Sequence, residues 1–158
     1  MLSIRTEPLT AEAFAPFGDV LERPTEPGRL YFDSALGNLR EHAHASLSLS
    51  MRAPTQALPM EAISLERHEF SSQSFVPVDV DDWLVVVAPH AETGGPDVSR
   101  VRAFRARGDQ GVTYKPNTWH HGLTVFERPA TFAIVMWRDG GKGDEEFVDV
   151  PPFMILPD

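Results

Sequence analysis

Residues 63–78 read ISLERHEFSSQSFVPV, two runs in which apolar and polar residues alternate, joined by a short polar segment. Alternation with a period of two is typical of a β-strand with one buried face. The joining segment, residues 69–72, is a tight connection, and a new strand begins after it at Gln73. This stretch therefore predicts two consecutive strands.

Runs of the same kind recur along the chain, separated by turn residues such as glycine and proline. They lie at residues 20–23, 45–51, 63–68, 74–78, 83–88, 101–106, 111–115, 122–126 and 131–137. Short runs without alternating helices predict an all-β sandwich or barrel, and closure into a barrel would remove exposed strand edges. One short helix is expected at residues 10–17, with Thr10 as its N-cap and Gly18 as its stop.

A chain of 158 residues is long enough for one hydrophobic core and short for two, so we expect a single domain over residues 1–158. Its 14 lysines and arginines against 23 acidic residues leave a formal net charge of -9. This charge repels nucleic acids and anionic membranes, and we expect neither as a partner. A small anionic substrate stays compatible, because a few local cations reverse the field inside a pocket.

The chain has no cysteine, so histidines and carboxylates are its strong candidate metal ligands. The N-terminal segment MLSIRTEPLT lacks the basic start and apolar run of a secretory signal. The longest apolar run, residues 83–88, is too short to cross a bilayer. The expected location is the cytoplasm.

The alternating strands also sort polar side chains by face. In residues 63–68, Glu66 and His68 share one face, opposite Ile63 and Leu65, and Gln73 follows on the next strand. Nitrogen and oxygen donors that converge from several directions suit a metal with an open position for substrate. The alternative is a surface strand with solvated charges. In residues 45–51, leucine and methionine alternate with serine, and alternation alone does not say which face is interior.

Residues 111–122, GVTYKPNTWHHG, supply a further donor. Asn117 suits the left-handed conformation of a tight turn, and His120 then enters the next strand with His121 on the opposite face. Which histidine faces the interior stays open. Tyr114 and Trp119 are candidates to wall the pocket, with an ordinary core position as the alternative.

Cations for a substrate carboxylate are Arg52, Arg67 and Lys115, of which Arg67 is the weakest because it alternates away from Glu66. A second histidine pair, His42 and His44, has the familiar metal spacing but lacks a carboxylate five residues later. We interpret it as a surface feature or as a mobile lid.

The motifs Glu66-x-His68-x4-Gln73 and Asn117-x-x-His120 are variants of the two cupin motifs. Together with AFAPFGDVLE at residues 13–22, LERH at residues 65–68, QSFVP at residues 73–77, WLVVVA at residues 83–88 and GVTYKPNTWHH at residues 111–121, they make the chain resemble the ureidoglycolate lyase family. The resemblance runs from about Leu9 to Pro152.

The resemblance implies a homodimeric cupin barrel, a double-stranded β-helix with jelly-roll topology. It implies conversion of (S)-ureidoglycolate to glyoxylate and urea in allantoin and purine breakdown, with a divalent metal as cofactor. Nickel is the metal that the resemblance favours, with manganese and zinc as alternatives. One departure is Lys115, which stands where the family often has histidine, and another is Gln73, a neutral and weaker ligand than glutamate.

Both lines of reasoning give one set of candidate residues. The candidate metal ligands are His68, His120, Glu66 and Gln73; the candidate catalytic groups are Glu66, His68, His120 and Lys115; the candidate substrate contacts are Arg52, Tyr114, Trp119 and His121. Glu66 is the first choice for a general base, or else it is a ligand that frees a neighbouring base. The alternative functions are a non-catalytic small-molecule-binding cupin, and a cupin isomerase or epimerase acting on a sugar or on a small hydroxy or keto acid.

Overall fold

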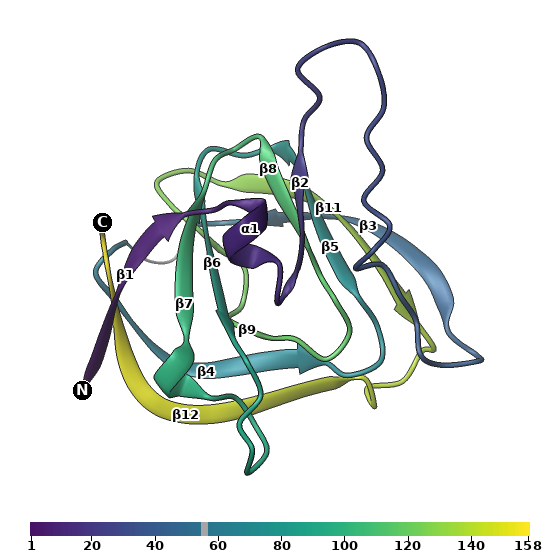
Figure 1. Cartoon of the computed structure of the whole chain (residues 1–158). Helices are drawn as coiled ribbons and strands as arrows, with labels where there is room; N and C mark the ends of the chain where they lie inside the picture. The colour runs from purple at the N-terminus through teal and green to yellow at the C-terminus, as the bar shows by residue number, and fades with distance from the viewer. Residues whose placement is uncertain (55–56) are drawn as a thin grey trace.

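The computed structural model describes residues 1–54 and 57–158, and its regular structure is almost entirely β (Figure 1). Its strands are β1 (Leu2–Pro8), β2 (Gly18–Glu22), β3 (His44–Arg52), β4 (Met60–His68), β5 (Gln73–Asp79), β6 (Trp83–Ala88), β7 (Arg102–Ala106), β8 (Gln110–Tyr114), β9 (Trp119–His120), β10 (Thr124–Val125), β11 (Ala130–Arg138) and β12 (Glu145–Leu156). The helices are α1 (Ala11–Phe14) and the 3-10 turn η1 (Val98–Arg100). Neither of these helices approaches the length and apolar character that crossing a membrane requires.

The strands form two sheets. One has the order β10-β6-β7-β1-β12-β4-β9, and β9 pairs with β6 as well as with β4, which closes six of its strands into a ring. The other has the order β2-β8-β5-β11-β3 and faces the first across a hydrophobic core. Only β1 pairs in parallel, with β7 and β12, among the pairings of the described strands. This is a cupin-like barrel, which confirms the predicted fold class.

Strand β6 shows why the sheets pack together. All of its residues are buried, because both of its faces are covered. Trp83, Val85 and Val87 point into the core between the two sheets, while Leu84 and Val86 join a second cluster on the other face. The continuous apolar run of this strand is therefore a consequence of its central position.

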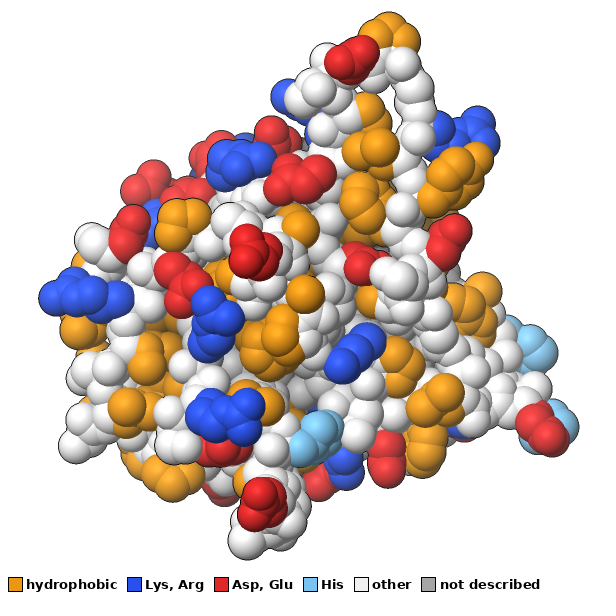
Figure 2. All heavy atoms as spheres, in the orientation of Figure 1, with side chains coloured by type: hydrophobic (Ala, Val, Ile, Leu, Met, Phe, Trp, Pro, Cys, Tyr) orange, Lys and Arg blue, Asp and Glu red, His pale blue; other side chains and the backbone are white. Residues whose placement is uncertain are grey.

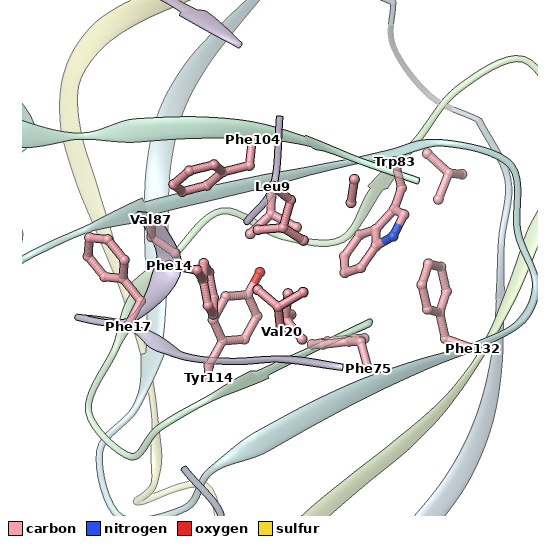
Figure 3. Packing of buried hydrophobic residues seen from close by; sticks show 14 of the residues in the cluster. Leu9, Phe14, Phe17, Val20, Phe75, Trp83, Val87, Phe104, Tyr114 and Phe132 are labelled. Carbon is pink, nitrogen blue, oxygen red and sulfur yellow. The ribbon is translucent and has the colours of Figure 1, made fainter. Parts of the chain in front are cut away.

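Aromatic rings fill much of the space between the sheets (Figure 3). Trp83 and Phe132 meet edge to face with ring centroids 4.9 Å apart, and Phe75 lies 6.1 Å from Phe132. Helix α1 adds Phe14, which packs against Tyr114. Such tilted and edge-to-face arrangements are the favoured geometries of aromatic pairs, so these contacts stabilise the core beyond the burial of apolar area.

The structure differs from the sequence expectations at several elements. Helix α1 is shorter than residues 10–17, although the Thr10 side chain does cap it by accepting a hydrogen bond from the backbone of Ala13. Strands β1 and β12 were not predicted, and β12 is interrupted by two prolines where its register with β4 shifts. Alternation fails on β4 opposite this shift, because Ile63 is 57 % exposed whereas Leu65 is 1 % exposed.

Strand β3 resolves the question that alternation left open. Its serines lie on the inner side of the sheet, since Ser50 and Ser48 pair with Phe132 and Ile134 on β11, although Ser48 is exposed at this edge. Its apolar residues Leu47, Leu49 and Met51 point outward and are 73 %, 71 % and 73 % exposed. The apolar side of this edge strand is thus the solvent side in the single chain.

Candidate active site

Three potential ligands converge at one end of the interior. Glu66 and His68 lie two residues apart on β4 and so share a face, and His120 on β9 stands directly opposite Glu66. The ligand atoms of the three residues all lie within 4.8 Å of one another. Glu66 Oε1 is 3.8 Å from His120 Nε2. Strand alternation and one cross-strand pair are enough to build this cluster.

The turn before β9 fixes the position of His120. Asn117 has φ of 68°, in the left-handed region that its residue type was predicted to adopt. Its backbone N–H donates to the carbonyl of His68 at 2.7 Å, and its side-chain oxygen accepts from Arg67 at 2.6 Å. The turn is therefore tied to the end of β4, next to the residues that His120 must meet.

The imidazole of His120 is buried and oriented. Its ring stacks on Tyr114 at 4.2 Å between centroids and an interplanar angle of 12°. Its Nδ1 lies 2.9 Å from the carbonyl oxygen of Thr118, which can only accept, so Nδ1 carries the hydrogen and Nε2 presents a lone pair toward Glu66. Burial lowers the pKa of His120 to about 3, so the ring is neutral near physiological pH.

The other two donors are also perturbed. Burial raises the pKa of the Glu66 carboxyl to about 7; nearby Glu145 adds to this and Arg52 opposes it. Burial lowers the pKa of His68, an effect that the neighbouring Asp144 and Glu145 oppose. Neutral imidazoles are metal ligands, and a carboxyl with a pKa near 7 can gain and lose a proton at working pH.

These three donors fit a divalent metal. Two imidazole nitrogens and one carboxylate oxygen come from two strands, which is the kind of ligand set that transition metals take in proteins. Gln73 adds a side-chain oxygen that is buried and has no hydrogen-bond partner among the described residues. The site thus offers one further neutral oxygen at its edge.

A cavity of about 370 Å³ opens onto Glu66 and His68. Its wall combines apolar residues with cations and carboxylates, and the cations are Arg40, Arg52, Arg138 and Lys142. As many carboxylates line the cavity, and Arg40 is paired with two of them, so a small anion would be bound by individual cations such as Arg52 rather than by a net positive field. The cavity is large enough for a small carboxylic acid and offers a guanidinium group to its carboxylate.

The structure brings together part of the predicted site. Glu66, His68, Gln73 and Arg52 line the cavity, and His120 lies directly behind them, stacked on Tyr114.

The remaining candidates lie elsewhere. Lys115 is exposed and does not line the cavity. Trp119 packs in the other hydrophobic cluster, beneath the guanidinium of Arg67, because its side chain alternates away from that of His120. His121 is half-buried and its Nδ1 lies 3.0 Å from the carbonyl of Gly122.

Two other predictions about faces can be compared with the structure. Arg67 points away from the cavity, as alternation predicted, and forms an ion pair with Glu146. His42 and His44 are both exposed, which agrees with the interpretation of this pair as a surface feature.

Six charged residues at the cavity were missed by sequence reasoning. They are Arg40, Arg138, Asp139, Lys142, Asp144 and Glu145. Arg40 comes from the long segment between β2 and β3, and the others come from the end of β11, the loop that follows it and the start of β12. None of them belongs to a motif with a fixed spacing from Glu66 or His68, so the sequence carries no local signal for them.

Comparison with known proteins gives the family to which this chain is similar. The family model described as "Ureidoglycolate lyase" matches residues 1–155. The ureidoglycolate lyase of Brucella melitensis biotype 2 is 41 % identical, with 84 % of this chain and 82 % of that protein aligned. The ureidoglycolate lyase of Pseudomonas entomophila is 34 % identical, with 99 % of this chain and 98 % of that protein aligned. The ureidoglycolate lyase of Stutzerimonas stutzeri is 38 % identical, with 100 % of this chain and 96 % of that protein aligned.

A solved structure supports the fold alone. The crystal structure of a dTDP sugar isomerase from Desulfovibrio desulfuricans G20 matches with a TM-score of 0.50 and 19 % sequence identity, covering 85 % of this chain and 82 % of that one. At this identity the match says nothing about substrate. The family model and the curated relatives, however, span nearly the whole chain, and they show that it belongs to the ureidoglycolate lyase family.

Proposed function

We propose that this chain is a lyase that cleaves (S)-ureidoglycolate to glyoxylate and urea, a step in allantoin and purine breakdown. The observation that carries the proposal is the convergence of Glu66, His68 and His120 at a cavity whose wall includes arginine side chains. The chain shares its family with the ureidoglycolate lyases of Brucella and Pseudomonas over almost its full length. Both observations point to the same small, anionic substrate.

The reaction needs one proton removed and one delivered. Ureidoglycolate carries a carboxylate, a hydroxyl and a ureido nitrogen on one carbon, so it is a carbinolamine. When the hydroxyl proton leaves, the C–O bond becomes a carbonyl, the C–N bond breaks, and the departing nitrogen takes up a proton to give urea. A well-placed acid–base group contributes roughly a hundred- to ten-thousand-fold to such a step.

Glu66 is the group best suited to this transfer. Because its pKa is raised to about 7, its carboxylate can accept the hydroxyl proton and its carboxylic acid can return that proton to the leaving nitrogen. Arg52 lies on the cavity wall, and its guanidinium suits the substrate carboxylate. In this assignment Arg52 would bind the substrate carboxylate, and the reacting carbon would lie near Glu66.

His68 and His120, with Gln73 at the edge, would hold a divalent metal, and nickel is the metal that we propose. Glu66 would then act as the base beside the metal; the alternative is that it completes the ligand set, in which case the charge of the metal would lower its pKa and another group would carry the proton. A metal bound there would lower the pKa of a coordinated hydroxyl group and so favour its deprotonation. The neutral state of both imidazoles is the state that ligates. Manganese and zinc are the competing ions, because both accept histidine and carboxylate ligands.

The test is glyoxylate release from ureidoglycolate by purified protein. We expect extensive chelation to silence the reaction and added nickel to restore it more fully than manganese or zinc. Metal content measured on the same samples should follow the activity. Full turnover by metal-free protein would overturn the metal assignment, and binding of ureidoglycolate without any release of glyoxylate would favour the non-catalytic binding cupin.

We further propose that the protein is a homodimer whose interface is the outer face of β3. This face carries Leu47, Leu49 and Met51, all more than two thirds exposed, and β3 is the edge strand of its sheet. The stripe has no charged side chain, so a second copy related by a two-fold axis would meet no like charge there. Covering it would also remove an exposed apolar edge strand.

Hydrophobic side chains also gather on the segment that follows β2 and projects from the barrel (Figures 1 and 2). They include Leu30 and Tyr31, which are 52 % and 70 % exposed.

Light scattering should give a mass of about 35 kDa, twice the 17.6 kDa of one chain. Leu49→Arg should shift the mass to that of one chain, whereas Ile63→Arg, at an exposed position on the other sheet, should not. A single-chain mass for the unmodified protein would overturn this proposal.

A further inference from the structure

His68 has a neighbour that comes from a distant part of the chain. Asp144 lies on the loop between β11 and β12, and its side chain is 9 % exposed. Its Oδ2 atom is 3.4 Å from Nδ1 of His68. That nitrogen is buried, and because the contact with Asp144 falls short of hydrogen-bond geometry, it has no hydrogen-bond partner among the residues that the structure describes. The Asp144 carboxylate is nevertheless an acceptor so close that a small rotation of the ring would complete a hydrogen bond.

Asp144 is itself held firmly. Its Oδ1 atom accepts hydrogen bonds from the backbone N–H groups of Phe70 and Ser71, at 2.6 and 3.1 Å. Its backbone carbonyl accepts from the N–H of Glu69 at 2.8 Å. These three donors form the tight connection that directly follows His68, so the carboxylate is fixed relative to the end of β4.

A cation secures the same loop from the other side. Arg40 lies 3.9 Å from Oδ2 of Asp144, forms an ion pair with Asp139 at 3.0 Å, and donates to the carbonyl of Trp137 at 2.9 Å. Asp139 and Trp137 flank the start of the loop, and Asp144 ends it. Both ends of the loop are thus anchored, and the Asp144 carboxylate keeps its direction toward His68.

We propose that Asp144 is a positioning residue, which accepts the Nδ1 hydrogen of His68 and thereby holds the ring in the tautomer whose Nε2 lone pair faces the cavity. A neutral imidazole has one N–H, and a carboxylate oxygen can only accept, so the ring places its hydrogen on Nδ1. The Thr118 carbonyl imposes the same tautomer on His120. Two imidazoles then present lone pairs to one point, as a ligand pair requires.

Asp144→Asn tests this assignment with little change in shape. The two backbone N–H groups of Phe70 and Ser71 require an oxygen, so the amide oxygen stays where Oδ1 was and the amide NH₂ group faces His68. An NH₂ group donates, which favours an acceptor at Nδ1 and moves the ring hydrogen to Nε2. The lone pair then points away from the cavity.

The readout is the tautomer of His68 in metal-free protein, from long-range ¹⁵N–¹H correlation spectra at pH 8, assigned with His68→Ala. We expect the Nδ1–H form in the unmodified protein and a shift to the Nε2–H form in Asp144→Asn. Glu146→Gln is the matched control, because this carboxylate lies two residues away and pairs with Arg67 outside the cavity. It should leave the tautomer unchanged.

Nickel affinity should fall roughly 10- to 100-fold in Asp144→Asn, as for other partners of ligating histidines, and remain unchanged in Glu146→Gln. An Nε2–H tautomer in the unmodified protein would overturn the inference without any variant, as would an unaltered tautomer in Asp144→Asn. The inference rests on the proposed function only in taking the cavity as the reaction site. The expected tautomer without glyoxylate release would refute the function and leave the positioning role intact.

Discussion

The two ends of the space between the sheets share strands β5 and β11 and have opposite properties. At one end Phe132 packs edge to face against Trp83 and Phe75 (Figure 3), and Nε1 of Trp83 donates a hydrogen bond to the carbonyl of Gln110. Phe75 also reaches the wall of the cavity, where the two ends meet. At the other end stand the cavity and its charged groups. In the described part of the chain, the buried side-chain N and O atoms without a hydrogen-bond partner are Nε of Arg40, Nδ1 of His68 and Oε1 of Gln73.

All three of these atoms belong to residues that line the cavity. A buried polar group without a good partner costs about 1–3 kcal/mol, so the cavity end destabilises a fold that the aromatic end stabilises. The comparison teaches that stability and chemistry are separated along one interior. Substitutions at the aromatic end should therefore change the free energy of unfolding, and substitutions at the cavity end should change turnover.

The largest effect is expected from removal of the imidazoles. His68→Ala and His120→Ala should each reduce glyoxylate release at least a hundred-fold, because the ring is lost both as a ligand and as a neighbour of Glu66. The far-ultraviolet circular dichroism spectrum should stay unchanged. His44→Ala is the control, since His44 is exposed and lies outside the cavity. Near-normal turnover in both cavity variants would end the assignment of this site.

The next largest effect is expected on folding stability rather than on turnover, from a substitution at the aromatic end. Phe132→Ala removes a ring that is 0 % exposed and contacts both Phe75 and Trp83, and should lower the free energy of unfolding by about 3–5 kcal/mol. Urea denaturation measures this directly. Tyr31→Ala, at a side chain 70 % exposed, should change stability by less than about 0.5 kcal/mol. Equal losses in the two variants would contradict the packing described here.

A smaller effect on the free energy of unfolding, an increase instead of a decrease, is expected from substitution of Glu66. Its pKa in the folded protein, about 7, lies above its ordinary value of 4.5, so the stability associated with its protonated form is complete below pH 4.5 and is lost as the pH rises through 7. Glu66→Gln stays neutral at every pH. In chelated protein at pH 8 it should therefore be more stable than the unmodified chain by roughly 3 kcal/mol, although inactive.

The pH dependence distinguishes this explanation from better packing of glutamine. The difference in unfolding free energy between Glu66→Gln and the unmodified chain should grow between pH 4.5 and 7 and level off above pH 8. Denaturant curves across this range provide the measurement. A difference that is constant with pH would show that the buried charge does not carry the cost.

The smallest effects should separate the two cations that sequence reasoning grouped together. Arg52→Ala removes a guanidinium from the cavity wall and should raise KM about tenfold, because the substrate carboxylate loses a charged partner. Lys115→Ala changes an exposed side chain that does not line the cavity and should alter kcat and KM less than about twofold. Initial rates over a range of ureidoglycolate concentrations decide this, and the reverse ranking would return Lys115 to the site.

The amino-acid sequence by itself determined most of the strands, the fold class and the residues at the centre of the candidate site. Period-two alternation is a local property, so the runs at β4 and β5 could be read without a structure, as could the continuous apolar run at β6. Alternation also put Glu66 and His68 on one face, and Asn117 marked the turn before His120 because few side chains tolerate a positive φ. Near neighbours in the chain carried all of this information.

Only the tertiary structure decided which face of each strand is interior and which distant residues complete the cavity. The apolar side of β3 points outward, and hydrophobicity alone would have placed it inside. Asp144 contacts His68 across a sequence separation of 76 residues, and Arg40 contacts Asp144 across 104 residues, through a loop and a long connection without a motif. Their positions depend on the pairing of β4 with β12 and of β11 with β3, and cross-strand pairing is set by the packing of the whole barrel rather than by any local pattern.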